Sequence, residues 1–119
     1  MEKENRQYFP NGKLRSLWTP THYTDWRIDG SLRQDYETDI AGRKNGLYKM
    51  YFNNGSLFKE FNYLKDKLHG AYKIYDDNGD LREDCNYENG VKVGESKTWK
   101  DGKLESHCIW ENGVPRSLI

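Results

Sequence analysis

The phrase Asn/Asp-Gly-x-Leu recurs five times along this chain, and the repetition constrains the fold more than any other feature of the sequence. The copies begin at Asn11, Asp29, Asn54, Asn78 and Asp101. Their glycines are 18, 25, 24 and 23 residues apart, so the last three intervals are regular and the first is short. A fixed period with a shorter terminal unit is typical of repeat architectures.

Each copy predicts a β-hairpin. Asn-Gly and Asp-Gly are strong hairpin signals, because both central residues of a type I′ turn need a positive φ. Even positions after the turn glycine are apolar, so Leu57, Phe61 and Tyr63 are expected on one face of the second strand. The odd positions are mostly polar, with Phe58 and Ile109 as exceptions. This period of two indicates half-buried strands.

One hairpin cannot bury its apolar face alone. The sequence therefore predicts an all-β fold in which stacked antiparallel hairpins form a single elongated repeat sheet, a solenoid. A chain of 119 residues is one domain. We expect degenerate units and a cap in residues 1–45, with segment 16–28 as the cap, regular repeats in 46–113 and a tail in 114–119. A closed β-barrel or an ordinary meander is the alternative.

The amino-acid composition argues against several classes of protein. The 19 Lys and Arg balance the 19 Asp and Glu, which argues against a strongly basic nucleic-acid binder and a polybasic membrane anchor. Only 34% of residues are apolar, but nine Tyr and four Trp supply large buried areas and argue against disorder. We see no secretory signal and no transmembrane segment, so we expect a cytoplasmic protein.

The repeat frame resembles a known family, the MORN-variant repeat. The residues that carry the resemblance are Gly46, Tyr48, Tyr51, Asn54, Gly55, Leu57, Glu60 and Tyr63, followed by the junction "KLHG" at 67–70 and the next copy from Gly70 to Tyr87. Trp99 departs from the frame by one residue. The resemblance implies an interaction scaffold. It extends to the YwqK-type antitoxin group, which implies a protein that binds and neutralises a toxin.

No motif predicts catalysis. The chain has no nucleophile elbow, P-loop or dinucleotide fingerprint. Of three histidines, only His22 lies where a site could form, beside the aromatic residues of the expected cap; His69 and His107 have structural explanations. We therefore predict no catalytic residue and no cofactor, and we expect that the protein is not an enzyme.

The two cysteines also predict neither a metal site nor a disulfide. Cys85 and Cys108 have no C-x-x-C spacing. They occupy equivalent positions in adjacent repeats, which places them about 9–10 Å apart, too far for a disulfide. We expect two reduced thiols on the buried face.

Two surfaces are candidates for binding a partner. The copy from residue 76 to 88 is acidic, and Asp76, Asp77 and Asp80 surround its turn together with Arg82. Such a cluster attracts a basic partner, although solvation of the sheet is the more common explanation of a run of charges. The second surface consists of three aromatic residues of the expected cap, Trp18, Tyr23 and Trp26. Trp and Tyr are good interface residues, but these three could instead plug the end of the sheet.

These observations predict a non-enzymatic protein–protein interaction module. We expect an inhibitor (an antitoxin, an immunity protein or a phage-type inhibitor) that neutralises a partner such as a nuclease. The alternative is a peripheral membrane scaffold that uses basic clusters, one at Arg43, Lys44 and Lys49 and one between Lys92 and Lys103. Direct nucleic-acid binding through the aromatic residues is disfavoured by the zero net charge. An open edge also makes us expect a homodimer.

Overall fold

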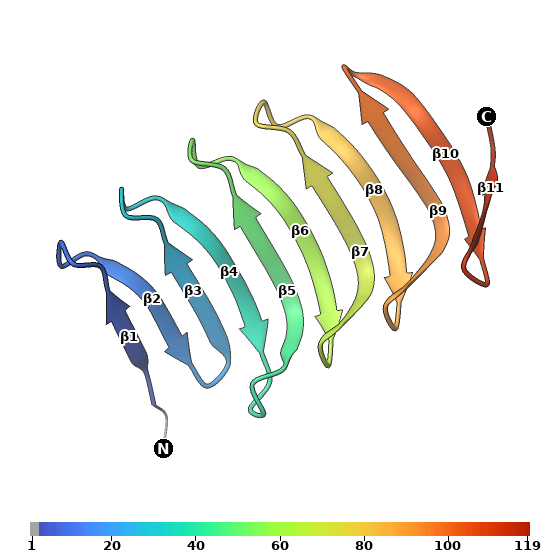
Figure 1. Ribbon diagram of the computed structural model, residues 1–119. Coiled ribbons are helices and arrows are strands. Elements are labelled where there is room, and N and C mark those ends of the chain that lie inside the picture. The colour runs from blue at the N-terminus through green and yellow to red at the C-terminus, as the bar shows by residue number, and fades with distance from the viewer. Residues whose placement is uncertain (1–2) are drawn as a thin grey trace.

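The computed structural model describes residues 3–119, which form one open antiparallel sheet in which every strand pairs with its neighbours in the chain (Figure 1). The strands are β1 (Asn5–Tyr8), β2 (Leu14–Thr19), β3 (His22–Trp26), β4 (Leu32–Thr38), β5 (Lys44–Tyr51), β6 (Leu57–Leu64), β7 (Lys67–Tyr75), β8 (Leu81–Glu88), β9 (Val91–Lys100), β10 (Lys103–Glu111) and β11 (Val114–Ser117). The described residues contain no helix.

The sheet is a single layer that measures 52 × 33 × 15 Å. Its termini lie at opposite ends (Figure 1). The predicted elongated all-β sheet is confirmed, and the closed barrel is wrong, because β1 and β11 are the two ends of the strand order.

The expected cap does not exist as a separate element. Residues 16–28 supply most of β2 and β3, which lie inside the sheet with β1 outside them. The C-terminal segment forms the last strand, where Pro115 sits on an edge, the position in a sheet that tolerates a missing N–H. Residues 1 and 2 of the expected first unit lie outside the described residues.

Two kinds of turn join the strands, and only one of them is the type I′ turn that we expected. We call the edge with the turns after β1, β3, β5, β7 and β9 the upper edge, and the opposite one the lower edge (Figure 1). After β5, the Gly55 N–H donates to the Phe52 carbonyl (3.0 Å) and the Phe52 N–H donates to the Ser56 carbonyl (2.9 Å). Only Gly55 has a positive φ in this turn. This pattern is a type I turn followed by a glycine bulge.

Four of the five Asn/Asp-Gly copies have this three-residue loop, so the type I′ expectation is wrong for them. In those copies the Asn or Asp keeps a negative φ, because only the residue after a type I turn must be left-handed. Asp101 and Gly102 both have positive φ values, 52° and 76°, and form the two-residue turn. Three turns of the lower edge also have two residues with positive φ and are two-residue turns: Lys65-Asp66, Asn89-Gly90 and Asn112-Gly113.

The shorter loop explains the position of Trp99. In the preceding repeat Tyr75 pairs with Leu81, and in this one Trp99 pairs with Leu104. The cross-strand pair of aromatic residue and leucine is therefore kept. Because the loop has one residue fewer, the aromatic residue stands three positions before the glycine instead of four.

A bulge follows the leucine in each of these hairpins. Lys59 pairs with Met50 and Leu57 pairs with Tyr51, so Phe58 has no partner of its own. Since Met50 and Tyr51 point to opposite faces, Leu57 lies on the opposite face from Phe61 and Tyr63. The expectation that all three share a face is wrong for this reason.

The bulge also explains why an apolar residue stands at position 58. The Phe58 ring contacts the ring of Phe52 at a centroid distance of 4.5 Å, and the Lys59 ammonium lies 4.9 Å from the Phe58 centroid. Phe58 therefore packs at the upper edge instead of standing on a polar face.

Aromatic side chains pack into one row across six strands. We call this set the aromatic row; it consists of Trp18, Tyr23, Tyr36, Tyr48, Phe61 and Tyr72, which are paired in this order from β2 to β7. Consecutive ring centroids are 4.2 to 5.8 Å apart, close to the range in which aromatic pairs attract. Neighbouring rings thus cover each other in a sheet that has no second layer.

Towards the C-terminus, small residues continue the row. Tyr72 pairs with Cys85, and Ser96 pairs with Cys108. The Trp110 ring lies over this part of the sheet, and its Nε1–H donates to the Ser96 hydroxyl (2.9 Å). Cys85 is fully buried and both cysteines are free thiols, as predicted; Cys108 is half-buried. Burial raises the pKa of Cys85 to about 11, so this thiol stays protonated at neutral pH.

The opposite face carries a cross-strand row in which acidic and basic side chains alternate. We call it the charge row; its members are Asp35, Lys49, Glu60, Lys73, Asp84 and Lys97, each directly opposite the next, and His107 follows opposite Lys97. Opposite charges in such pairs stabilise a sheet. Asp84, part of the acidic copy, therefore stands between two lysines and does not belong to an acidic patch.

Replacing Phe61 with alanine should destabilise the fold by about 3 kcal/mol, because the Phe61 ring is buried between Tyr48 and Tyr72. Urea unfolding followed by fluorescence measures this change. Leu64→Ala in the same strand is the control, since Leu64 is 41% exposed, and it should cost far less. Equal losses in the two variants would contradict a core built on the aromatic row.

Replacing Glu60 with lysine should destabilise the fold by about 1 kcal/mol, because the new charge would face Lys49 and Lys73. Added salt should reduce the loss through screening. Glu60→Gln removes the carboxylate without adding a like charge, so it is the control and should lose less stability than Glu60→Lys. A loss that persists unchanged in 1 M salt, or that Glu60→Gln shares in full, would show that the alternation has no electrostatic role.

Candidate binding groove

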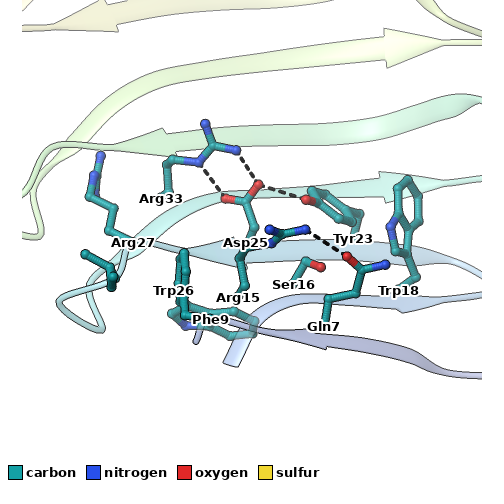
Figure 2. A pocket seen from close by; sticks show the side chains of 11 residues that line it. Gln7, Phe9, Arg15, Ser16, Trp18, Tyr23, Asp25, Trp26, Arg27 and Arg33 are labelled. Atoms are coloured by element: carbon teal, nitrogen blue, oxygen red, sulfur yellow. Dashed lines mark hydrogen bonds and ion pairs between the residues drawn. The ribbon is translucent and has the colours of Figure 1, made fainter. Parts of the chain in front are cut away.

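A pocket of about 590 Å³ opens where the N-terminal hairpins meet the upper edge, and it brings the predicted aromatic residues together. Trp18 comes from β2, whereas Tyr23 and Trp26 come from β3. All three line the pocket, together with Arg15, Arg27 and Arg33. Figure 2 shows the Asp25 side chain between those of Arg33 and Tyr23, with Trp18 beyond Tyr23. We call this the arginine pocket.

Asp25 is the hydrogen-bond acceptor at the centre of the arginine pocket. It is 2% exposed. Arg33 donates to both carboxylate oxygens, at 2.9 Å to Oδ1 and 2.6 Å to Oδ2, while Tyr23 and Gln34 donate to Oδ2 at 2.9 and 2.8 Å. Burial by itself raises the pKa of Asp25, but the hydrogen bonds from Arg33, Gln34 and Tyr23 outweigh it and hold this pKa below its ordinary value.

The wall formed by Tyr23 and Trp18 is held in place by the same network. Burial, together with the hydrogen bond to Asp25, raises the pKa of Tyr23 to about 12, so its hydroxyl remains a donor to Asp25 at neutral pH. The Trp18 ring packs on Tyr23 at a centroid distance of 4.2 Å and stays 39% exposed. Trp18 therefore presents a fixed aromatic surface to solvent.

Two arginines of the pocket are bound only to neutral groups. The Arg15 Nη2 donates to Gln7 Oε1 (2.8 Å). Arg27 donates to the backbone carbonyls of Leu32 (2.9 Å) and Tyr51 (2.5 Å). Within residues 3–119 neither guanidinium forms an ion pair with a carboxylate. Since three arginines line the pocket against Asp25 alone, it carries an excess positive charge.

The predicted acidic cluster lies at the β7–β8 turn, and its members have different roles. The Asp76 carboxylate accepts the N–H groups of Asn78 and Asp80, each at 3.0 Å, so this acid stabilises the turn instead of being dispensable to the fold. Asp77 is exposed, and its carbonyl accepts the Asn54 side-chain amide of the neighbouring turn (3.1 Å). The Arg82 Nε donates to the Trp99 carbonyl (2.8 Å).

Three of these four residues line a second pocket, of about 440 Å³. Asp76, Asp77 and Arg82 border it, and Asp80 is not among its lining residues. The apolar part of its lining includes Phe52, Phe58 and Ile74. We call this the acidic pocket. It lies at the upper edge and is lined by residues between the end of β5 and β8, whereas the arginine pocket is lined by residues between β1 and β4.

A third pocket, of about 410 Å³, connects the other two. It shares Arg27 with the arginine pocket, and it shares Phe52, Phe58 and Asp77 with the acidic pocket. The three pockets are therefore neighbours along the upper edge, and we call them together the edge groove. The structure thus gathers six of the seven predicted residues in one groove, in two groups at its ends.

Comparison with protein families agrees with this architecture. The family model described as "MORN repeat variant" matches residues 1–19, 44–65 and 68–89, together just over half of the chain. The chain belongs to the MORN repeat variant family. No curated protein matches the chain significantly.

Family membership supports a general class of function. MORN repeats indicate a module for protein interaction or for membrane association. In residues 3–119 no helix has the length and apolarity to span a bilayer.

Sequence reasoning named Arg82 but missed the other arginines of the groove, Arg15, Arg27 and Arg33. Arg15, Arg33 and Arg82 occupy the bulge that follows the repeat leucine, because the strand pairing skips each of them. A signal was present, since Leu-Arg follows the turn in three of the five copies. Reading it would have required the knowledge that these MORN hairpins contain a bulge at that position.

The histidines stand outside the groove. His22 pairs with the Asp35 carboxylate, on the face opposite the aromatic row. His107 contacts Glu95 at 3.2 Å, and His69 Nδ1 accepts the N–H of Asn89 (3.2 Å), which links two neighbouring turns. Among the residues that the structure describes, no group of three or more His, Cys, Asp or Glu side chains is arranged to hold a metal ion.

Replacing Asp25 with asparagine should destabilise the fold by about 2 kcal/mol at pH 7, because the charge-assisted hydrogen bonds from Arg33 are lost. The folded-state pKa of Asp25 is depressed. Its contribution is therefore complete above the unfolded pKa of about 3.9 and is lost as the pH falls through the lower folded-state value.

Urea unfolding of both proteins between pH 7 and pH 2 tests this expectation. The stability gap between wild type and Asp25→Asn should close at the acidic end. Asp101→Asn, which changes an exposed carboxylate in a turn, is the control and should show little gap at any pH. A gap that stays constant across the range would contradict a stabilising Asp25 carboxylate.

Proposed function

We propose that this MORN-repeat protein is a non-enzymatic module that binds a partner protein in the edge groove and thereby inhibits it. The observation that carries the proposal is the combination of Trp18, Tyr23 and Trp26 with three arginines in one open pocket. Trp, Tyr and Arg are the residues that most often dominate the binding energy of protein interfaces.

The groove is also ordered before any partner arrives. Asp25 fixes Tyr23 and Arg33, and backbone carbonyls fix Arg27. Side chains that are already immobilised lose less entropy on association, which favours tight binding. Tight binding to a small rigid surface is what an inhibitor of the antitoxin or immunity type requires.

The acidic pocket supports a partner with a basic surface, such as a nuclease. Asp77 presents an exposed carboxylate beside the groove. A carboxylate in this position would occupy the place of a nucleic-acid phosphate and would speed the encounter with a basic protein.

The lysines of the basic clusters are partly engaged in other contacts, so we favour a protein partner over a lipid surface. The Lys44 ammonium lies 5.3 Å from the ring centroids of both Tyr36 and Tyr48. The Lys92 ammonium lies 5.0 Å from the Trp110 ring. Cations over aromatic rings gain part of their stabilisation inside the protein, which reduces the benefit of moving them to anionic lipid.

The proposal predicts that tagged protein, used as bait in a lysate of its source cells, retains one stoichiometric partner protein. Trp26→Ala should lower the recovery at least about fivefold, since truncation of such a residue costs more than about 1 kcal/mol. Ile40→Ser is the matched control, because Ile40 is apolar, 92% exposed and outside the groove. The isolated partner should then lose activity on addition of wild-type protein.

Two results would contradict this function. If the wild-type protein retains no stoichiometric partner, the proposal that it is a binding module is wrong. A partner that is recovered equally with Trp26→Ala and Ile40→Ser would exclude the edge groove as its site.

A further inference from the structure

We infer that the edge groove binds an extended segment of its partner that is acidic at one end, apolar in the middle and basic at the other end. The inference rests on the proposed function and adds the chemistry of the bound segment. Its basis is the opposite charge of the two pockets that end the groove.

The arginine pocket selects the acidic end. Arg33 is neutralised by Asp25, but Arg15 and Arg27 contact only amide, hydroxyl and carbonyl oxygens. Arg15 is exposed and joined to Gln7 by one surface hydrogen bond, so it can turn towards a carboxylate without leaving a buried group unpaired. Arginine binds carboxylates in a two-pronged geometry, and the aromatic walls lower the local exposure to water.

The acidic pocket selects the basic end. Asp76 and Asp77 line it against Arg82, so acids are in excess. Arg82 donates to the Trp99 carbonyl, and the Asp77 carboxylate is exposed. A lysine or arginine of the partner would find an accessible carboxylate here.

The connecting pocket selects the apolar middle. Its lining includes Tyr51, Phe52 and Phe58, and the rings of Phe52 and Phe58 contact each other. Arg15 lies in β2 and the acidic turn follows β7, so the two ends are separated by five strand spacings, about 24 Å. An extended chain covers about 3.3 Å per residue, so about seven residues would join the two charged ends.

Three peptides of eleven residues test the inference by fluorescence anisotropy. Each has the same centre, Gly-Leu-Trp-Leu-Gly, and carries a fluorescein label. The mixed peptide has three glutamates at one end and three lysines at the other. The control peptides have three glutamates at both ends or three lysines at both ends. At low salt the mixed peptide should bind about tenfold more tightly than either control.

Variants at the two ends of the groove supply a readout that misfolding cannot imitate. Arg15→Glu should weaken the mixed peptide about fivefold and should strengthen the lysine-only peptide, because a repulsive charge becomes attractive. Asp77→Lys should strengthen the glutamate-only peptide. Lys67→Glu, an exposed change in a strand end at the lower edge, is the control and should leave the order of the three affinities unchanged.

The inference is overturned if the three peptides bind equally, if none binds, or if Arg15→Glu weakens all three alike. A single-stranded DNA that competes with the mixed peptide at equal concentration would also overturn it, in favour of nucleic-acid binding. These failures differ from a failure of the proposed function. If the partner is still lost with Trp26→Ala while the peptides show no charge preference, the proposed binding function is supported, and only the inference about a segment with opposite charges at its ends is wrong.

Discussion

Contact between aromatic rings on neighbouring strands is the interaction on which the rest of this structure depends. A sheet normally buries one face against a second layer, but this sheet is only 15 Å thick and has none. Among the described residues, the buried apolar side chains are Tyr48, Phe61 and Cys85. The sheet face is covered instead by its own side chains, each ring lying on the ring of the next strand. Each hairpin therefore owes its stability to its neighbours, as in other repeat proteins.

The binding groove is a product of turn geometry. A three-residue loop with a glycine bulge closes the first four hairpins of the upper edge, and a second bulge follows the repeat leucine. A bulge changes the direction of one side chain. The residues at these bulges are Arg15, Arg33, Phe58 and Arg82. All four line the edge groove. The lower edge has tight two-residue turns at Lys65-Asp66, Asn89-Gly90 and Asn112-Gly113.

The parts of the fold that depend on local signals could be predicted from the sequence. Repeated Asn/Asp-Gly turns and a period of two were sufficient for the hairpins, the single sheet and the two free cysteines. What failed depended on irregularities within the hairpins. One extra residue in the turn converts type I′ geometry into a bulged loop, and a separate bulge after the repeat leucine places Leu57 on the other face and brings Arg33 to Asp25. The turn at Asp39–Arg43 was missed because it lacks the Asn/Asp-Gly signal.

The candidate site was predictable by residue type but not by position. Trp18, Tyr23 and Trp26 line one pocket, but they are interior strand residues and do not form a cap. The sequence placed Asp76, Asp77 and Asp80 around one turn and did not group Asp84 with them. The sheet adds their roles, because Asp76 stabilises the turn, Asp77 is exposed and Asp84 belongs to the charge row. Only the register between strands, which a single repeat does not reveal, could distinguish these roles.

The consecutive order of the strands has a consequence for how the chain reaches this structure. Since each strand pairs only with strands adjacent in sequence, the loops that must close during folding are short, and an all-β protein with such low contact order should fold quickly for its class. The large rings stand in β2 to β7, whereas the same row continues through Cys85, Ser96 and Cys108. The half that leaves the ribosome first therefore carries most of the ring stacking. It can form a template on which the later hairpins are added one at a time.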